Sequence, residues 1–424
     1  MVLAIINILV IIAIIFLLYK RADSKPLKSF LIPGISLKIL AGILVGLIYK
    51  YHYGGGDTFN LFHDAVAYSE FALHSPTYFI QLLFEQDVPD SLRENFLYSN
   101  HPRSLIASKI FSFFSLITNN NYWISSMYLS LFSFSGMWYL ANEITLRYPE
   151  TKWAAGIGFL LFPSVVFWSS GVLKESLIMG SLCYLFGFIL KNTPLRKKNF
   201  LRSSLFGTLF IIILWQLKYY YLAAFLSVSI TGITILLIRS KFTILDSKPL
   251  SLFILWIILF MLFLGASSQL YPTLQMDNFL FFLLDTHDTI YINSKPDNLI
   301  HYDNLNATFQ SLLKNSPLAL FSGLFRPGVW DINSLLYILP TIENLFILIS
   351  TVLVFRNIQK LSSPITRILI FSLIVYILLL AVLMAFAAPN FGTLMRYKVG
   401  YLPFLVYLVC INNPLLKFLK KGDT

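Results

Sequence analysis

The sequence predicts an all-α polytopic membrane protein with about 11 transmembrane helices. Of its 424 residues, 57% are hydrophobic and only 12% are charged, whereas about a quarter of the residues in a soluble protein are charged. The mean hydropathy is +0.72. Apolar runs of roughly 20 residues, the length that a bilayer-spanning helix needs, recur along the chain. They do not alternate between apolar and polar residues, as the strands of a membrane barrel would.

The predicted spans form one integral membrane domain over residues 1–424. The first apolar run, VLAIINILVIIAIIFLLY, begins directly after Met1 without a basic segment or a small-residue cleavage site, so we interpret it as a retained span. Cys183 and Cys410 both lie inside apolar runs and are expected to be small core residues. The spans are expected at residues 2–19, 30–49, 122–142, 153–170, 176–190, 203–217, 220–238, 250–266, 336–355, 367–387 and 399–413.

The connections between these spans alternate in charge. Six of them, KRADSKPLK, RYPETK, KNTPLRKKNFLR, RSKFTILDSKP, RNIQKLSSPITR and the tail KFLKKGDT, hold 20 of the 32 lysines and arginines. By the positive-inside rule these six are cytoplasmic, so the N-terminus lies outside. Residues 103–118 would invert every later connection if they formed a span, and we therefore expect an interfacial helix there. The expected location is the cytoplasmic (inner) membrane of a bacterium.

Two outer loops are long, residues 50–121 with amphipathic helices and residues 267–335, and long loops are usually functional. The first begins with YHYGGGDTFNLFHDAVAY, where three glycines predict a sharp turn. Asp57 follows this turn at the edge of the apolar region, where a carboxylate can act as a general base. Asp57 is equally a candidate N-cap for the helix that follows. A metal site from His63 and Asp64 is a weaker possibility.

A second group of charges lies between two spans almost without a loop, where charged residues are usually paired or functional. Lys174 and Glu175 fall there, and Glu175 is a candidate either for the site or for the start of the next helix.

The third group is cationic and lies at span ends. Its members suit either a phosphate or lipid headgroups. The candidate substrate-binding residues are Lys174, Lys218, Arg326, Arg396 and Lys398, with His101 and Tyr397 beside them.

The layout of these motifs resembles the GT-C superfamily of membrane glycosyltransferases, including protein O-mannosyltransferases and aminoarabinose transferases. The similarity lies in Asp57 after a span, in HPRSLIASKIFSFFSLIT, in FPSVVFWSSGVLKESL and in GTLMRYKVGYLP. The resemblance implies a polyprenyl-phosphate-linked sugar as donor and a glycan, lipid or protein as acceptor, with inversion at the anomeric carbon. The span at residues 2–19 departs from the pattern, because many members begin with the span that precedes the aspartate.

The resemblance also implies residue roles. Asp57 matches the catalytic aspartate of the first loop, Glu175 an acidic residue of the second, and Arg396 the basic residues that bind the donor phosphate. Some members use a divalent cation, Mg²⁺ or Mn²⁺, which Asp57 and Glu175 could share.

Two other functions remain open at this point. An O-antigen-type polymerase or ligase would depend on Arg326 more than on Asp57. A transporter or flippase of lipid-linked glycans would show inverted repeats, and we find none in the sequence. The net charge of +12 is attributed to the basic connections, so the expected partners include membrane lipids but no nucleic acid.

Overall fold

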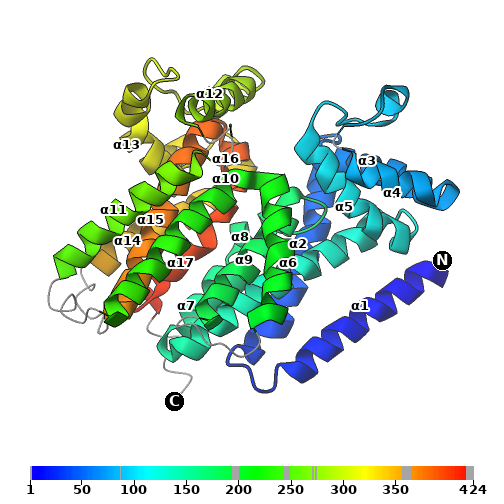
Figure 1. Cartoon of the computed structure of the whole chain (residues 1–424). Helices are drawn as coiled ribbons and strands as arrows, with labels where there is room; N and C mark the ends of the chain where they lie inside the picture. The colour runs from blue at the N-terminus through cyan, green and yellow to red at the C-terminus, as the bar shows by residue number, and fades with distance from the viewer. Residues whose placement is uncertain are drawn as a thin grey trace. The chain divides into compact units, whose positions relative to one another are not determined.

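The computed structural model describes residues 2–85, 87–192, 200–241, 249–269, 272, 275–355 and 364–416. Within these residues the chain is helical, and its single extended contact is an isolated bridge between Leu299 and Asn390 (Figure 1). The chain divides into two compact units. Unit 1 holds residues 1–191 and 197–219, and unit 2 holds residues 192–196 and 220–424. Each unit is described separately below.

In its described residues, unit 1 contains nine α-helices and the first part of a tenth. In it, α2 packs against α6 and α8, and α3 packs against α4 and α5, with α3, α4 and α5 side by side in Figure 1. The bounds are α1 (Val2–Arg21), α2 (Lys28–Tyr51), α3 (Asp57–His74), α4 (Pro76–Phe84), α5 (Pro102–Thr118), α6 (Tyr122–Arg147), α7 (Lys152–Gly156), α8 (Pro163–Trp168), α9 (Lys174–Asn192) and α10 (Phe200–Lys241).

The segment predicted as the first long loop folds into a small helical layer with its own core. The core side chains are Tyr68, Phe79, Leu82, Val88, Phe96 and Leu105. The helix expected at residues 103–118 is α5, which buries one face against α3 and leaves Phe113 and Ile117 about half exposed. Residues 57–118 are therefore ordered by apolar packing between α3, α4 and α5.

Two close helix crossings depend on glycines, as small residues allow backbones to approach within membrane helices. In unit 1, a Cβ added at Gly136 of α6 would lie 2.1 Å from the carbonyl oxygen of Gly180 in α9. In unit 2, a Cβ added at Gly323 would lie 2.2 Å from the carbonyl oxygen of Ala381. Neither crossing leaves room for a larger residue.

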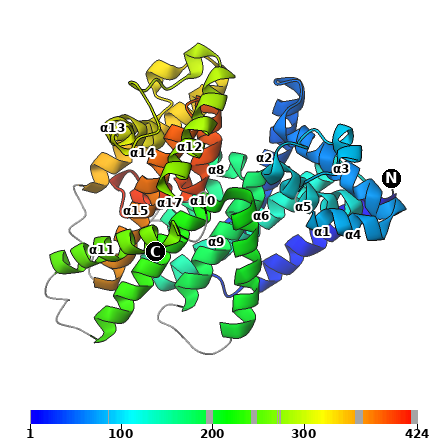
Figure 2. The ribbon, with the colours of Figure 1, turned by 45° about the horizontal axis from the view of Figure 1, so that its top comes forward.

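Unit 2 is built around α15. Helices α12 and α13 pack against α15, and α14 packs against α17 (Figure 2). The Tyr401 hydroxyl donates to the carbonyl of Gly323 at 2.6 Å and ties the start of α17 to α13. The bounds are α11 (Pro249–Ser267), α12 (Met276–Ile292), α13 (Phe309–Phe325), α14 (Ile338–Phe355), α15 (Pro364–Ala387), α16 (Phe391–Tyr397) and α17 (Leu402–Cys410).

Within the described residues, five helices are long and apolar enough to cross a membrane, judged by length and composition. They are Val2–Arg21, Lys28–Tyr51, Phe206–Arg239, Leu335–Val354 and Thr366–Ala387, with a shorter apolar helix at Leu250–Ala266. The membrane character predicted from the sequence is therefore supported, but the predicted number of 11 spans is not confirmed.

Local interruptions explain part of the difference. The predicted span at residues 153–170 is divided into α7, a π-helical turn (Ile157–Leu161) and α8, which begins at Pro163. The predicted spans at 203–217 and 220–238 lie in α10, which consists of two helical segments joined by a kink at Lys218 (φ −149°, ψ 75°), at the boundary predicted between them. The predicted span at 399–413 contains α17, whose nine residues are fewer than half of the roughly 20 that a crossing needs.

The charge pattern that predicts the orientation lies partly outside the described residues. Four of the six basic connections include residues 193–199, 242–248, 356–363 and 417–424. The external N-terminus and the cytoplasmic side of these connections therefore remain predictions.

Candidate functional site

The predicted glycine turn is present in unit 1 and leads directly into α3. Gly54, Gly55 and Gly56 have φ angles of 69°, 132° and 110°, a region that L side chains rarely adopt. The N–H of Gly55 donates to the carbonyl of Tyr49 at 2.8 Å, which closes the turn onto the end of α2. The helix then begins at Asp57, with Gly56 as its N-cap. Asp57 is thus the first helical residue and not the cap.

The Asp57 carboxylate is held by a side chain from the segment before α5. The Tyr98 hydroxyl donates to Oδ1 of Asp57 at 2.6 Å. The Tyr98 ring also meets the ring of His101 edge-on, with 5.7 Å between centroids. His101 occupies the N-cap position of α5 and its side chain is exposed. Asp57 and His101, both predicted from the sequence, are therefore joined through Tyr98.

Asp64, two turns further along α3, has a different role from the metal ligand considered above. It is fully buried, and its two carboxylate oxygens accept the N–H groups of Leu97 (2.8 Å) and Tyr98 (3.0 Å). His63 lies beside it, with 3.3 Å between Nδ1 and Oδ1. Asp64 therefore fixes the backbone of the segment that carries Tyr98.

The start of α5 also contacts the start of α9 and the middle of α10. Lys174, the first residue of α9, donates from Nζ to the Ser104 Oγ at 3.1 Å. The Arg103 guanidinium lies over the Tyr219 ring at 4.7 Å. Lys174 and Arg103 therefore bring two cations to the first turn of α5.

Glu175 and Lys218 form a buried ion pair at the interruption of α10. Their Oε1 and Nζ atoms are 3.2 Å apart, and the side chains are 0% and 6% exposed. Such a pair is retained only if the mutual attraction offsets the desolvation of both charges. Glu175 pairs with Lys218, which lies in a helix that begins 25 residues later in the chain.

These contacts define the unit 1 cluster, a chain of contacts between the starts of three helices and the interruption of a fourth. It brings together five residues predicted from the sequence and three that were not. The unit 1 cluster consists of Asp57, Tyr98, His101, Arg103, Ser104, Lys174, Glu175 and Lys218.

Lys38 is a charged residue that sequence reasoning missed. It lies within α2 and is 1% exposed. Its Nζ donates to the carbonyls of Ser169 (2.7 Å) and Val166 (3.5 Å), and also to the Ser169 hydroxyl. A cation at these carbonyls complements the negative end of α8. The signal was available, because Lys38 interrupts the apolar run ISLKILAG.

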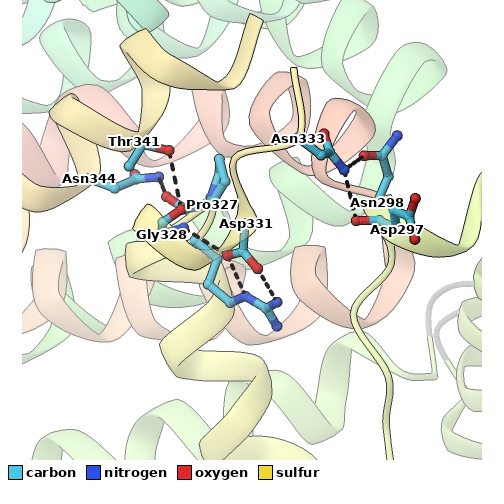
Figure 3. Close-up of polar contacts among 9 residues, drawn as sticks. Asp297, Asn298, Pro327, Gly328, Asp331, Asn333, Thr341 and Asn344 are labelled. Atoms are coloured by element: carbon cyan, nitrogen blue, oxygen red, sulfur yellow. Dashed lines mark hydrogen bonds and ion pairs between the residues drawn. The ribbon is translucent and has the colours of Figure 1, made fainter. Parts of the chain in front are cut away.

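In unit 2, the predicted cation Arg326 is already engaged by the carboxylate of Asp331. Figure 3 shows Asp331 with its hydrogen bond to Gly328. The Arg326 Nε and Nη2 donate to the two oxygens of Asp331 at 3.0 and 2.6 Å, a bidentate pair. Asp331 also accepts the N–H of Gly328 at 2.8 Å. The same guanidinium lies over the Phe391 ring at 4.7 Å. A phosphate at Arg326 would therefore have to displace Asp331.

Lys398 is engaged by backbone groups at the end of α13. Its Nζ donates to the carbonyls of Arg326 (2.7 Å) and Leu324 (3.4 Å) and to Oδ1 of Asn344 (3.3 Å), and the residue is 2% exposed. Arg396 of α16 is 7% exposed, and the carbonyl of Tyr397 accepts the Tyr221 hydroxyl at 2.5 Å. The predicted residues Arg326, Arg396, Tyr397 and Lys398 belong to unit 2, and Asp57 belongs to unit 1. An approach of Asp57 to the unit 2 cations therefore remains a prediction.

The donor set for a shared divalent cation does not fit the described residues. Glu175 is paired with Lys218, and the Tyr98 hydroxyl occupies Oδ1 of Asp57. Within the described part of the chain, no three or more His, Cys, Asp or Glu side chains gather as metal ligands. The reaction proposed for this protein is therefore assigned to its side chains, without a role for Mg²⁺ or Mn²⁺.

Comparison of the chain with protein-family models, with curated proteins and with solved structures finds no match. The resemblance to the GT-C superfamily thus remains a prediction from the residues quoted above.

Proposed function

We propose that the protein is a membrane glycosyltransferase of the GT-C type. It transfers a sugar from a polyprenyl-phosphate donor to a hydroxyl of a glycan, lipid or protein on the extracytoplasmic face of the bacterial inner membrane. The main support is the unit 1 cluster, in which the carboxylate of Asp57 is connected through Tyr98 and His101 to the cationic start of α5. Five helices that are long and apolar enough to cross a membrane suit a lipid-linked donor.

In this proposal Asp57 is the general base. It accepts the proton of the acceptor hydroxyl while the acceptor oxygen forms a bond to the sugar C1. The bond between C1 and the phosphate oxygen breaks, and its electron pair leaves with polyprenyl phosphate. Attack opposite the leaving group inverts the anomeric carbon. The half-exposed position of Asp57 at the first turn of α3 lets an acceptor from water reach it.

The leaving phosphate is stabilised by charges at the start of α5 and α9. Arg103 and Lys174 supply the positive charge. The N-terminal ends of α5 and α9, of 17 and 19 residues, add their helix dipoles. Positive groups that are held in place before the reaction stabilise the charge that develops on the phosphate.

The buried pair of Glu175 and Lys218 has a supporting role. Its two charges lie at the first turn of α9 and at the interruption of α10. The pair keeps the N-terminal end of α9, and with it Lys174, in place. We therefore assign Glu175 to positioning and not to proton transfer, which revises the catalytic role considered from the sequence.

Transfer assays in proteoliposomes test this proposal. Purified protein is incubated with a panel of synthetic polyprenyl-phosphate sugars, and the transferred sugar is measured by mass spectrometry. We expect transfer by the wild type and its loss in Asp57→Asn. Glu70→Gln, which removes an exposed carboxylate from the same helix, is the matched control and should retain transfer. Equal activity of wild type and Asp57→Asn would contradict the role of Asp57.

The polymerase or ligase alternative depends on Arg326. Its bidentate pair with Asp331 favours a structural role for this arginine and so disfavours that alternative.

A further inference from the structure

We propose that Tyr98 is the positioning residue for Asp57, and that Asp64 acts on Asp57 through Tyr98. This inference deepens the proposed function and rests on it for the identity of Asp57 as the base. Tyr98 does not follow from the motifs that the sequence offered for the site, and Asp64 was considered there only as a metal ligand. Their contacts give Tyr98 and Asp64 each a defined role in holding the Asp57 carboxylate.

The geometry begins with the spacing of two carboxylates on one helix. Asp57 and Asp64 are seven residues apart in α3, which places them on the same face of the helix, two turns from each other. Both face the segment before α5, and both bind it. Asp64 binds its backbone, and Asp57 binds the side chain of Tyr98.

The contact at Asp64 is built to be rigid. A buried carboxylate is costly unless its oxygens accept hydrogen bonds, and Asp64 accepts two backbone N–H groups while being 0% exposed. Hydrogen bonds to a charged acceptor are stronger than those between neutral groups. Leu97 and Tyr98 are therefore tied to α3 at a fixed distance from Asp57.

The contact at Asp57 follows from this arrangement. With its backbone held, Tyr98 directs its hydroxyl back along α3 to Oδ1 of Asp57 at 2.6 Å. An O–H donor on one carboxylate oxygen favours the charged form of the group and fixes the plane of the carboxylate. A base that must accept a proton in one direction gains from the fixed plane.

The main variant is Tyr98→Phe, which removes the hydroxyl and keeps the ring beside His101. We expect kcat to fall about tenfold, the loss typical of one hydrogen bond to a charged group, while KM for the donor stays within about twofold. Tyr78→Phe is the matched control, because Tyr78 lies in α4, packs edge-on against Phe71 of α3 and is outside the unit 1 cluster. It should leave kcat unchanged.

The second variant is Asp64→Asn, which leaves one of the two backbone N–H groups without its carboxylate oxygen. Hydrogen–deuterium exchange in peptides covering residues 96–101 should accelerate in Asp64→Asn and stay near wild type in Tyr98→Phe. The double variant should lose little more kcat than Asp64→Asn alone, because both changes act on one connection. Additive losses would contradict the connection between Asp64 and Asp57.

A measurement that needs no sugar transfer separates this inference from the proposed function. Carbodiimide couples amines to protonated carboxyl groups, so labelling of Asp57 followed by mass spectrometry reports how firmly its charged form is held. Tyr98→Phe should label faster than wild type at the same pH, and Tyr78→Phe should not. Unchanged labelling in Tyr98→Phe would overturn the positioning role. Absent transfer with faster labelling would leave the positioning intact and contradict only the proposed function.

Discussion

The charge of Lys174 at the start of α9 in unit 1 and those of Arg326 and Lys398 in unit 2 were predicted from the same kind of signal, a cation at the end of an apolar run. In unit 2, other groups of the chain bind these cations. Arg326 is neutralised by Asp331, and Lys398 donates to two carbonyls and an amide oxygen. In unit 1, Lys174 donates to the Ser104 hydroxyl, and the exposed Arg103 lies over the aromatic face of Tyr219.

This difference teaches that the partner of a cation, more than its position at a span end, separates a structural from a functional role. A buried bidentate pair holds a loop together, and removing one partner leaves a buried charge without its counterion. An exposed guanidinium stacked on an aromatic ring, such as that of Arg103, still attracts an anionic ligand. Unit 1 is thus the better candidate for phosphate chemistry, and the following variants test that difference.

Replacing the base should give the largest effect. We expect Asp57→Asn to reduce kcat by at least about 100-fold, the usual contribution of general base catalysis, without lowering the amount of folded protein in membranes. Sugar transfer at saturating donor measures this effect. A fall in kcat of less than about threefold would be too small for the loss of a general base. It would mean that unit 1 does not carry out the reaction.

Replacing the unit 2 arginine should act on stability instead. Arg326→Met leaves Asp331, whose side chain is 6% exposed, without its counterion, and we expect a loss of about 3 kcal/mol. Transfer per folded molecule should remain near wild type. Thermal unfolding in detergent, with binding and transfer measured on the folded fraction, checks both expectations. Loss of transfer with unchanged stability would favour the polymerase or ligase alternative.

Replacing the unit 1 lysine should weaken donor binding. We expect Lys174→Ala to raise KM for the polyprenyl-phosphate donor about tenfold with little change in melting temperature, because one charge near a phosphate is removed. Lys50→Ala is the control, since it removes an exposed cation from the end of α2 in the same unit. An equal rise in KM for both variants would mean that the summed electrostatic field of unit 1, and not the specific position of Lys174, attracts the donor.

The glycine turn should give the smallest effect. Gly55 has φ 132° and open space around its Cα, so Gly55→Ala introduces backbone strain without a clash. We expect a loss of about 1 kcal/mol and a modest fall in kcat, because the turn places the first residue of α3. Gly207→Ala, in helix α10 and also in open space, should not destabilise the protein. Equal unfolding temperatures for the two variants would contradict the strain at Gly55.

The local features of the site were predictable, whereas its partners were not. Three adjacent glycines predict a turn, and an apolar pattern at helical spacing predicts the helix at residues 103–118, because both depend on neighbouring residues. The pair of Glu175 with Lys218 joins residues 43 positions apart, and Asp64 contacts a backbone 33 residues away. Contacts of that kind arise only when helices pack, and no spacing in the sequence encodes them.

The same reasoning explains the count of membrane spans. Hydropathy averages over a window and does not register a break such as that at Pro163, whereas the boundary predicted between residues 217 and 220 coincides with the kink at Lys218. Nor does hydropathy penalise the buried serines of α6, such as Ser126 and Ser130, which suit helix packing more than contact with lipid. The helical class was therefore predictable, while the number of crossings depends on interruptions that only the fold displays.

One measurement tests the contrast between the units most directly. Asp57→Asn, Lys174→Ala, Arg326→Met and Lys398→Met are reconstituted in parallel, and both the folded fraction and the sugar transfer per folded molecule are determined. We predict that the two unit 1 variants fold, that Asp57→Asn loses transfer and that Lys174→Ala transfers less at low donor concentration, while the two unit 2 variants fold poorly and retain transfer per folded molecule. Full transfer by folded Asp57→Asn, together with none by folded Arg326→Met, would contradict this account.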